Sequence, residues 1–213
     1  MLQIKKLTFN MFSENTFVVW DEITKDCAVV DPGCFDEYEE KELSDFIEKN
    51  NFKVKYLINT HCHIDHIFGC EFIKEKFSPV YLAPEKDIPL LENVNVQSKK
   101  MGIEFSTSIL PDKYITEQTV VELGESELKF LFTPGHTPGE YCIYFQDEKF
   151  CITGDVLFYD SIGRTDLWGG NYDDLIKSIR EKLLTLPDET TIFPGHGQQS
   201  TILRERTENP FLN

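Results

Sequence analysis

Apolar positions along the chain fall into short runs and longer periodic stripes, and the two kinds alternate. Short runs rich in Val, Ile, Phe and Tyr predict β-strands. They lie at NTFVVW (15–20), DCAVVDPG (26–33), VKYLIN (54–59), ELKFLF (127–132), YCIYF (141–145), KFCITG (149–154) and TIFPG (191–195). Apolar residues at helical spacing predict helices over 37–49, 66–77, 172–184 and 201–208. The alternation predicts an α/β fold, and 213 residues suit one domain spanning 1–213.

Residues 84–117 do not follow this alternation. The segment is polar, weakly periodic and rich in turn residues. It predicts a helix and a long loop, which we expect to cover the functional site.

The charge and composition of the chain restrict its partners and its location. A net charge of −16 repels phosphate backbones, so nucleic acid is not expected as a partner. No apolar run approaches the roughly 20 residues of a membrane span, and the start MLQIKKLTFN lacks the apolar segment of a signal peptide. Six cysteines without CxxC spacing are typical of free thiols in a reducing compartment. These features predict a cytoplasmic protein that does not act at a membrane.

The five histidines of the chain are concentrated in turns that follow predicted strands. Three of them lie in THCHIDH (60–66), and the others lie in PGHTPG (His136) and FPGHG (His196). Histidine is the commonest metal ligand in sites of this kind, and loops at strand ends are where α/β proteins place functional groups. The pattern therefore predicts a metal centre.

The spacing of these residues predicts two groups of ligands. His61 and His63 project to the same side of an extended segment, and a third histidine from another loop completes a three-nitrogen face with an open position. Asp65, His66 and one more histidine form a second face. Asp155 in ITGDVLF is a candidate bridge, because a shared carboxylate holds two metals about 3.5–4 Å apart.

Each of these residues also has a purely structural interpretation. A single histidine beside a glycine is more often structural than a ligand, and an aspartate after a glycine often caps a turn. Arg164 in GRTD is compatible with binding of a substrate carboxylate, and equally with a structural ion pair. Cys62, between two candidate ligands, is expected to point away from the metals and to pack in the core.

The motifs THCHIDH, PGHTPG, GD and PGHG, in this order, resemble the metallo-β-lactamase superfamily. The resemblance implies a four-layer αββα sandwich with the metals at one edge of the two sheets. It also implies that the first metal is held by His61, His63 and His136, that the second is held by Asp65, His66 and His196, and that Asp155 bridges them. It further implies that Asp31, in VVDPG, orients the ligands by hydrogen bonds.

GDVLFYDSIGRTDLWGGN and RERTENPF resemble the short glyoxalase II-like hydrolases of this superfamily. This resemblance implies hydrolysis of a small-molecule acyl thioester such as S-lactoylglutathione by a hydroxide that bridges two divalent metals. Asp65 and Asp155 would be the catalytic carboxylates. Zinc is the expected metal, and the imidazole and carboxylate ligands also suit iron or manganese. Two alternatives stay open, namely an iron-dependent persulfide dioxygenase and, more remotely, an inactive binding module.

Overall fold

The computed structural model describes residues 1–212, and the fold divides into two compact units. The first unit comprises residues 1–114 and 123–125, and the second comprises residues 115–122 and 126–213. Each unit is built on one large sheet, with the ends of strands β6 and β7 at the boundary between the units.

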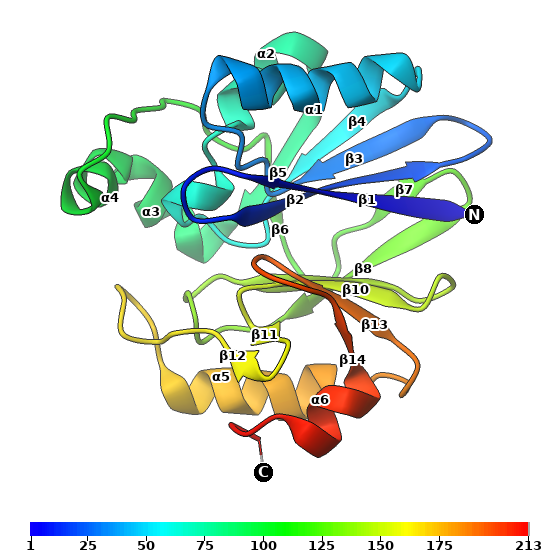
Figure 1. Ribbon diagram of the computed structural model, residues 1–213, viewed down its shortest axis with the longest axis vertical. Coiled ribbons are helices and arrows are strands. Elements are labelled where there is room, and N and C mark those ends of the chain that lie inside the picture. The colour runs from blue at the N-terminus through cyan, green and yellow to red at the C-terminus, as the bar shows by residue number, and fades with distance from the viewer. Residues whose placement is uncertain (213) are drawn as a thin grey trace. The chain divides into compact units, whose positions relative to one another are not determined.

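The first sheet has the order β1-β2-β3-β4-β5-β6. Its strands are β1 (Leu2–Phe9), β2 (Glu14–Asp21), β3 (Asp26–Val30), β4 (Lys53–Ile58), β5 (Val80–Pro84) and β6 (Lys113–Ile115). The first three strands form an antiparallel meander, whereas β3, β4 and β5 run parallel. Parallel neighbours require crossovers, which are supplied by helices α1 (Glu37–Lys49) and α2 (Cys70–Phe77) on one face of the sheet (Figure 1).

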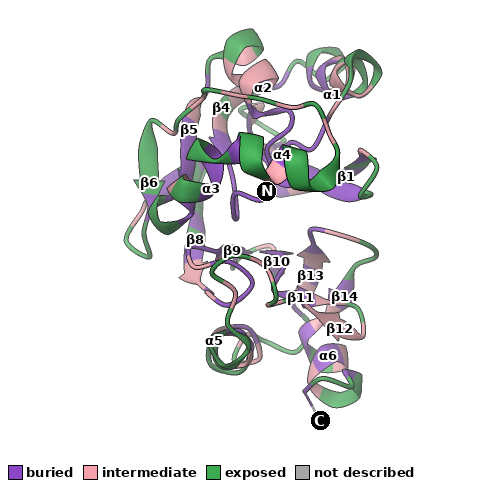
Figure 2. Ribbon diagram, turned by 90° about the vertical axis from the view of Figure 1, so that its left-hand side faces the viewer, coloured by how far each residue is buried: buried purple, intermediate pink, exposed green. Residues whose placement is uncertain are grey.

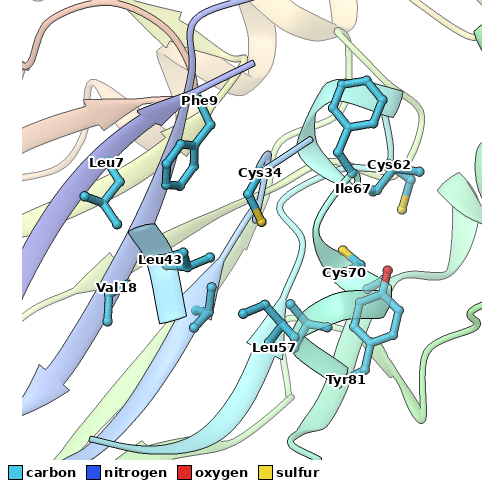
Figure 3. Close-up of a cluster of buried hydrophobic side chains, with 14 of the residues drawn as sticks. Leu7, Phe9, Val18, Cys34, Leu43, Leu57, Cys62, Ile67, Cys70 and Tyr81 are labelled. Atoms are coloured by element: carbon cyan, nitrogen blue, oxygen red, sulfur yellow. The ribbon is translucent and has the colours of Figure 1, made fainter. Parts of the chain in front are cut away.

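The core of the first unit lies between this sheet and its helices. Figure 3 shows Leu43 of α1 packed among side chains of the strands, with Cys34, Cys70 and Tyr81 in the same cluster. Helix α1 begins at Asp36, whose carboxylate accepts hydrogen bonds from two amides of the first turn. The cap and the apolar face together explain why this helix was predictable in both position and length.

The second sheet has the order β14-β13-β10-β9-β8-β7. Its strands are β7 (Val121–Leu123), β8 (Ser126–Phe132), β9 (Tyr141–Phe145), β10 (Phe150–Gly154), β13 (Thr191–Pro194) and β14 (Ser200–Thr201). Strands β10 and β13 are parallel and are joined through α5 (Tyr172–Ser178) and the π-helical turn η3 (Ile179–Leu183). Helices α5 and α6 (Ile202–Glu208) lie on one face of this sheet, and the small hairpin β11 (Leu157–Phe158) and β12 (Ser161–Ile162) follows β10.

The predicted α/β character is confirmed, and one helix boundary is corrected. The helix expected over 66–77 begins only at Cys70, because residues 64–66 form a separate 3-10 helix, η1 (Ile64–His66), followed by a turn over residues 67–69. The helix expected over 172–184 is present, but its last turn is the π-helical η3. The sequence did not predict the β11–β12 hairpin or strands β1, β5, β6, β7 and β14.

The segment 84–117 contains more helix than was expected. It forms the turn η2 (Glu85–Asp87) and the helices α3 (Ile88–Glu92) and α4 (Val94–Met101), followed by a long stretch without regular structure before β6. Figure 2 shows that α4 is mostly exposed, whereas strands β5, β9 and β10 are mostly buried. That this segment covers the functional site stays a prediction.

Within residues 1–212, none of the helices is long and apolar enough to cross a membrane.

All six cysteines are buried and free, so the native protein is expected to resist thiol reagents. Burial raises the pKa of Cys27 from an ordinary value near 9 to about 12, and it also raises the pKa of Cys34, Cys62 and Cys142. At neutral pH the thiolate fraction of Cys27 is then about a thousandfold lower than that of an exposed cysteine. With Ellman's reagent we expect no rapid reaction of the folded protein and six equivalents of thiol after denaturation. One equivalent released rapidly from the folded protein would contradict the assigned burial.

Candidate metal centre

In the first unit, the predicted site residues follow two neighbouring parallel strands. Asp31 comes directly after β3, and Asn59, Thr60 and His61 come directly after β4. Carboxyl ends of parallel strands meet at the same edge of a sheet, so the two turns lie side by side. Asp31 has a left-handed backbone (φ 48°), and its amide donates to the carbonyl of Ile58 at 2.9 Å. These turns fix the position of the Asp31 carboxylate.

The Asp31 carboxylate organises the turn that carries His61. It accepts hydrogen bonds from the amide of Thr60 at 2.8 Å and from the hydroxyl of Thr60 at 2.6 Å. Because the Thr60 hydroxyl donates its hydrogen to Asp31, it accepts from Nδ1 of His61, at 3.1 Å. His61 therefore carries its hydrogen on Nδ1, and Nε2 carries the lone pair that a metal ion requires. The orienting role expected for Asp31 agrees with these contacts.

The remaining histidines of THCHIDH cluster around His61. The ring centroids of His61 and His63 are 5.0 Å apart, and those of His61 and His66 are 4.1 Å apart. Nδ1 of His66 lies 3.3 Å from Oδ2 of Asp31, and Nε2 lies 3.8 Å from Oδ2 of Asp65. The first unit thus brings together all five of its predicted site residues.

In the second unit, the predicted site residues again follow strands. Asp155 comes directly after β10, and His196 follows β13, which is the parallel neighbour of β10. A hydrogen bond of 2.7 Å from the amide of Gly195 to the carbonyl of Gly154 joins the two turns. His136 lies in the turn between β8 and β9, after Gly135, where a Cβ atom would come within 2.3 Å of the backbone of Leu175. Close backbone packing therefore holds His136 in place.

The Asp155 carboxylate lies between two imidazole rings. Its Oδ2 is 3.5 Å from Nε2 of His136 and 3.6 Å from Nε2 of His196. Nδ1 of His136 lies 2.8 Å from the backbone carbonyl of Arg164, which can only accept a hydrogen bond, so Nδ1 carries the hydrogen. In the neutral ring, a lone pair on Nε2 then faces a carboxylate oxygen. That arrangement is unfavourable unless a proton or a metal cation lies between the two atoms.

The donor atoms fit a divalent cation in both units. Ligands bound at ~2.0–2.1 Å to one tetrahedral ion lie about 3.4 Å from each other. The separations of 3.5, 3.6 and 3.8 Å between the imidazole nitrogens and carboxylate oxygens are close to this value. The described residues therefore offer imidazole and carboxylate ligands of the kind that binds zinc, iron or manganese.

Glu14, a fully buried residue whose carboxyl group lies beside His66, was not predicted from the sequence. Its Oε2 accepts a hydrogen bond from the hydroxyl of Thr16 at 2.9 Å, and Oε1 lies 3.9 Å from Nδ1 of His66. Burial, as the largest cause, raises the pKa of Glu14 well above its ordinary value, and the neighbouring His66 lowers it. A Cβ at Gly33 would lie only 2.0 Å from Oε2 of Glu14, so the carboxyl group fills a space that only glycine leaves open. In the sequence, the only indication that Glu14 belongs to the site was its position as an acidic residue at the start of an apolar strand.

Glu140 plays a comparable part in the second unit and was also missed. Its side chain is fully buried, and Oε1 accepts a hydrogen bond of 2.7 Å from the backbone amide of Asp155. The contact fixes the turn that presents the Asp155 carboxylate. Its position directly after PGHTPG was the available signal in the sequence.

The side chain of Arg164 forms the structural ion pair that sequence analysis had left open. Its Nε and one terminal nitrogen donate to the two carboxylate oxygens of Asp166, at 2.7 and 2.8 Å. The pair is largely exposed, and it lowers the pKa of Asp166 to about 2. The backbone carbonyl of Arg164, rather than its charge, is the part that contacts a predicted ligand. Cys62 is fully buried in the core of the first unit, as expected.

Comparison with known proteins decides the family. A family model described as Metallo-beta-lactamase superfamily matches residues 10–196, a range that spans both units. The chain belongs to the metallo-β-lactamase superfamily. Among curated members of the superfamily, hydroxyacylglutathione hydrolase GloC of Haemophilus influenzae is 36% identical, over 100% of this chain and 99% of that protein. The resemblance expected from the motifs is thus confirmed.

Solved structures of superfamily members show the same fold. The crystal structure of the BLEG-1 B3 metallo-beta-lactamase matches with a TM-score of 0.91 and 31% identity, over 99% of this chain and 100% of that one. TTHA1623, solved in a di-iron-bound form, matches with a TM-score of 0.86 and 29% identity, over 98% of this chain and 100% of that one. The chain therefore has the metallo-β-lactamase fold, and it is a member of a superfamily of metal-dependent hydrolases.

Proposed function

We propose that the protein hydrolyses a small acyl thioester, such as S-lactoylglutathione, at a centre of two divalent metal ions. In this proposal the two units act together as one domain. His61, His63 and His136 would hold the first ion, Asp65, His66 and His196 would hold the second, and Asp155 would be a ligand of both. The relative GloC, which is named for the hydrolysis of hydroxyacylglutathione, is similar over the full chain and supports this substrate class.

The observation that carries the proposal is the position of the Asp155 carboxylate. One of its oxygens lies at nearly equal distances from the Nε2 atoms of His136 and His196. The family resemblance assigns these two histidines to different metals. A carboxylate placed between ligands of two ions has the geometry of a bridge. A turn-capping aspartate would instead point its side chain at backbone amides.

Two divalent ions supply, when bound, Lewis acidity toward a carbonyl oxygen and a lowered pKa for water. Zinc is the expected metal, and the donor set equally admits iron or manganese. The chain's own task is to hold the ligand nitrogens in the correct tautomer. Thr60 does so for His61, and the Arg164 carbonyl does so for His136.

Thioester chemistry suits a site of this composition. Water adds to the acyl carbon, the carbon–sulfur bond breaks, and the products are a carboxylic acid and a thiol. The thiol has a pKa near ~8.5, so it leaves as a thiolate without a strong general acid. We assign to Asp65, whose carboxylate lies 3.8 Å from Nε2 of His66, the orientation of the attacking water.

A paired assay on zinc-loaded and iron-loaded protein tests the proposal. Thiol release is measured with a panel of acyl thioesters, oxygen uptake with glutathione persulfide, and β-lactam opening with a chromogenic cephalosporin. We expect thiol release without oxygen uptake or β-lactam opening.

Oxygen uptake confined to the iron-loaded protein, with no thioester turnover, would instead establish the persulfide dioxygenase. β-Lactam opening without thiol release would give the protein the activity named for BLEG-1. No turnover in any assay by protein with full metal content would support the inactive binding module.

A further inference from the structure

A hollow beside His196 is not used by the metal chemistry proposed above. It has a volume of about 420 Å³ and lies within the second unit, between the β11–β12 hairpin and the turn that follows β13. Its lining includes Phe158, Tyr159, Ser161, Ile162, His196 and Gln198. The volume lies within the ~300–1,000 Å³ of typical small-molecule pockets.

The hollow adjoins a candidate metal ligand directly. The ring centroids of Phe158 and His196 are 6.4 Å apart, and His196 itself contributes to the lining. A group bound in the hollow therefore lies next to the reacting centre of the proposed hydrolase. This placement is typical of a pocket that selects one part of the substrate.

The C-terminal helix α6 contacts the β11–β12 hairpin that forms one wall of the hollow. The guanidinium carbon of Arg204 lies 3.8 Å from the centroid of the Tyr159 ring. The buried carboxylate of Glu205 accepts a hydrogen bond from the amide of Asp160 at 3.0 Å, and Asn209 donates to the carbonyl of Ser161 at 3.1 Å. These contacts give the RERTENP segment a role, because they fix the hairpin that forms one wall.

The chemistry of the lining selects an uncharged, mainly apolar group. Phe158, Tyr159 and Ile162 provide apolar surface, and Ser161 and Gln198 provide neutral hydrogen-bonding groups. Among the residues that the structure describes, the lining of the hollow contains no lysine or arginine. The nearby Arg204 is bound to Asp160 at 2.6 Å and to Glu208 at 3.1 Å, so its charge is already neutralised. The charged groups of glutathione therefore find no counter-ion there.

We infer that this hollow is the subsite for the acyl group of the thioester, and that it accepts apolar acyl chains longer than lactoyl. The inference rests on the proposed function and deepens it. A hydroxyl group on the acyl chain has Ser161 and Gln198 as neutral partners, while the chain packs on Phe158 and Ile162. Each fully buried methylene contributes about fourfold to binding.

Two measurements on the metal-loaded protein test the inference. The first compares kcat/KM for S-lactoylglutathione and S-(2-hydroxyhexanoyl)glutathione, and the second compares the affinities of the non-hydrolysable thioethers S-methylglutathione and S-hexylglutathione by calorimetry. We expect the longer chain to be favoured about tenfold in both, since the hollow is open and buries the methylenes only in part. In Ser161→Phe, which fills the hollow, the ratio should fall to about one. The matched control Thr207→Phe, on the exposed face of α6, should retain the wild-type ratio.

The outcomes separate this inference from the proposed function. Tighter binding of S-hexylglutathione that disappears in Ser161→Phe supports the subsite, even if no thioester is hydrolysed and the proposed function fails. Equal affinities for the two thioethers in the wild type would overturn the subsite, even if S-lactoylglutathione is hydrolysed rapidly. An advantage of the longer chain that persists in Ser161→Phe would also overturn it.

Discussion

Replacing Asp155 with alanine is expected to lower kcat/KM on the order of a thousandfold and to reduce the metal content of the purified protein. The carboxylate lies between the Nε2 atoms of His136 and His196, so its removal leaves both imidazoles without the anion that they share. Asp155→Asn keeps the shape of the side chain and removes its charge, and it should lose nearly as much activity. Metal per chain is measured by plasma mass spectrometry, and kcat/KM by thiol release.

The matched control for this variant is Asp166→Asn, which removes an exposed carboxylate of the same unit that forms an ion pair with Arg164. It should change neither metal content nor turnover by more than a small factor. The two-metal assignment also predicts that the wild-type protein carries close to two metal ions per chain. One ion per chain, together with full activity of Asp65→Ala and His196→Ala, would refute it.

Gly163→Ala is expected to lower turnover by about a hundredfold, although it adds only one methyl group. The new Cβ would lie 1.9 Å from the backbone carbonyl oxygen of Asp155 and 3.2 Å from Cβ of His136. Neither neighbour can give way without moving a predicted ligand, and a displacement of about 1 Å in an active site costs on the order of a hundredfold in rate. Overpacking should also lower the free energy of unfolding by about 1–3 kcal/mol. Turnover and chemical denaturation are measured on the same preparation.

Gly102→Ala separates the steric effect from the general cost of replacing a glycine. Gly102 ends helix α4 with φ +69°, and a Cβ there would meet no atom within 4 Å. The left-handed backbone costs alanine about 1–2 kcal/mol of stability, and turnover should stay at the wild-type value. Equal losses of turnover in Gly102→Ala and Gly163→Ala would show that the close contact with Asp155 is not the cause.

The sequence predicted elements best where local chemistry and periodicity agreed. The helix over 37–49 has an aspartate cap, an acidic first turn and an apolar stripe, and it forms with these bounds. The helix over 66–77 was predicted from Phe72, Ile73 and Phe77. It begins only at Cys70, because contacts of the turn that carries His66 keep the preceding residues out of the helix. Asn59 donates to the carbonyl of His66 at 2.8 Å and so holds that carbonyl outside a helix. This contact joins two different turns and has no periodic signature.

The candidate ligands could be predicted from the sequence more readily than the buried residues that hold them in position. The predicted residues lie in turns after strands, five of them in the first unit and three in the second, and their roles as ligands stay predictions. Glu14 and Glu140 were missed because each acts on a residue distant in the chain or through its backbone. Their acidic character is informative only once burial is known. The joining of ligands from the two units into one centre stays a prediction.

The buried cysteines have a consequence for an enzyme that acts on activated acyl groups. A thioester transfers its acyl group readily to any accessible thiolate, including one on the protein that binds it. Here the six thiols are buried, and burial holds the pKa of Cys27 and Cys62 far above neutrality. If the protein hydrolyses thioesters as proposed, none of its six buried cysteines presents an accessible thiolate that would compete with water for the acyl group.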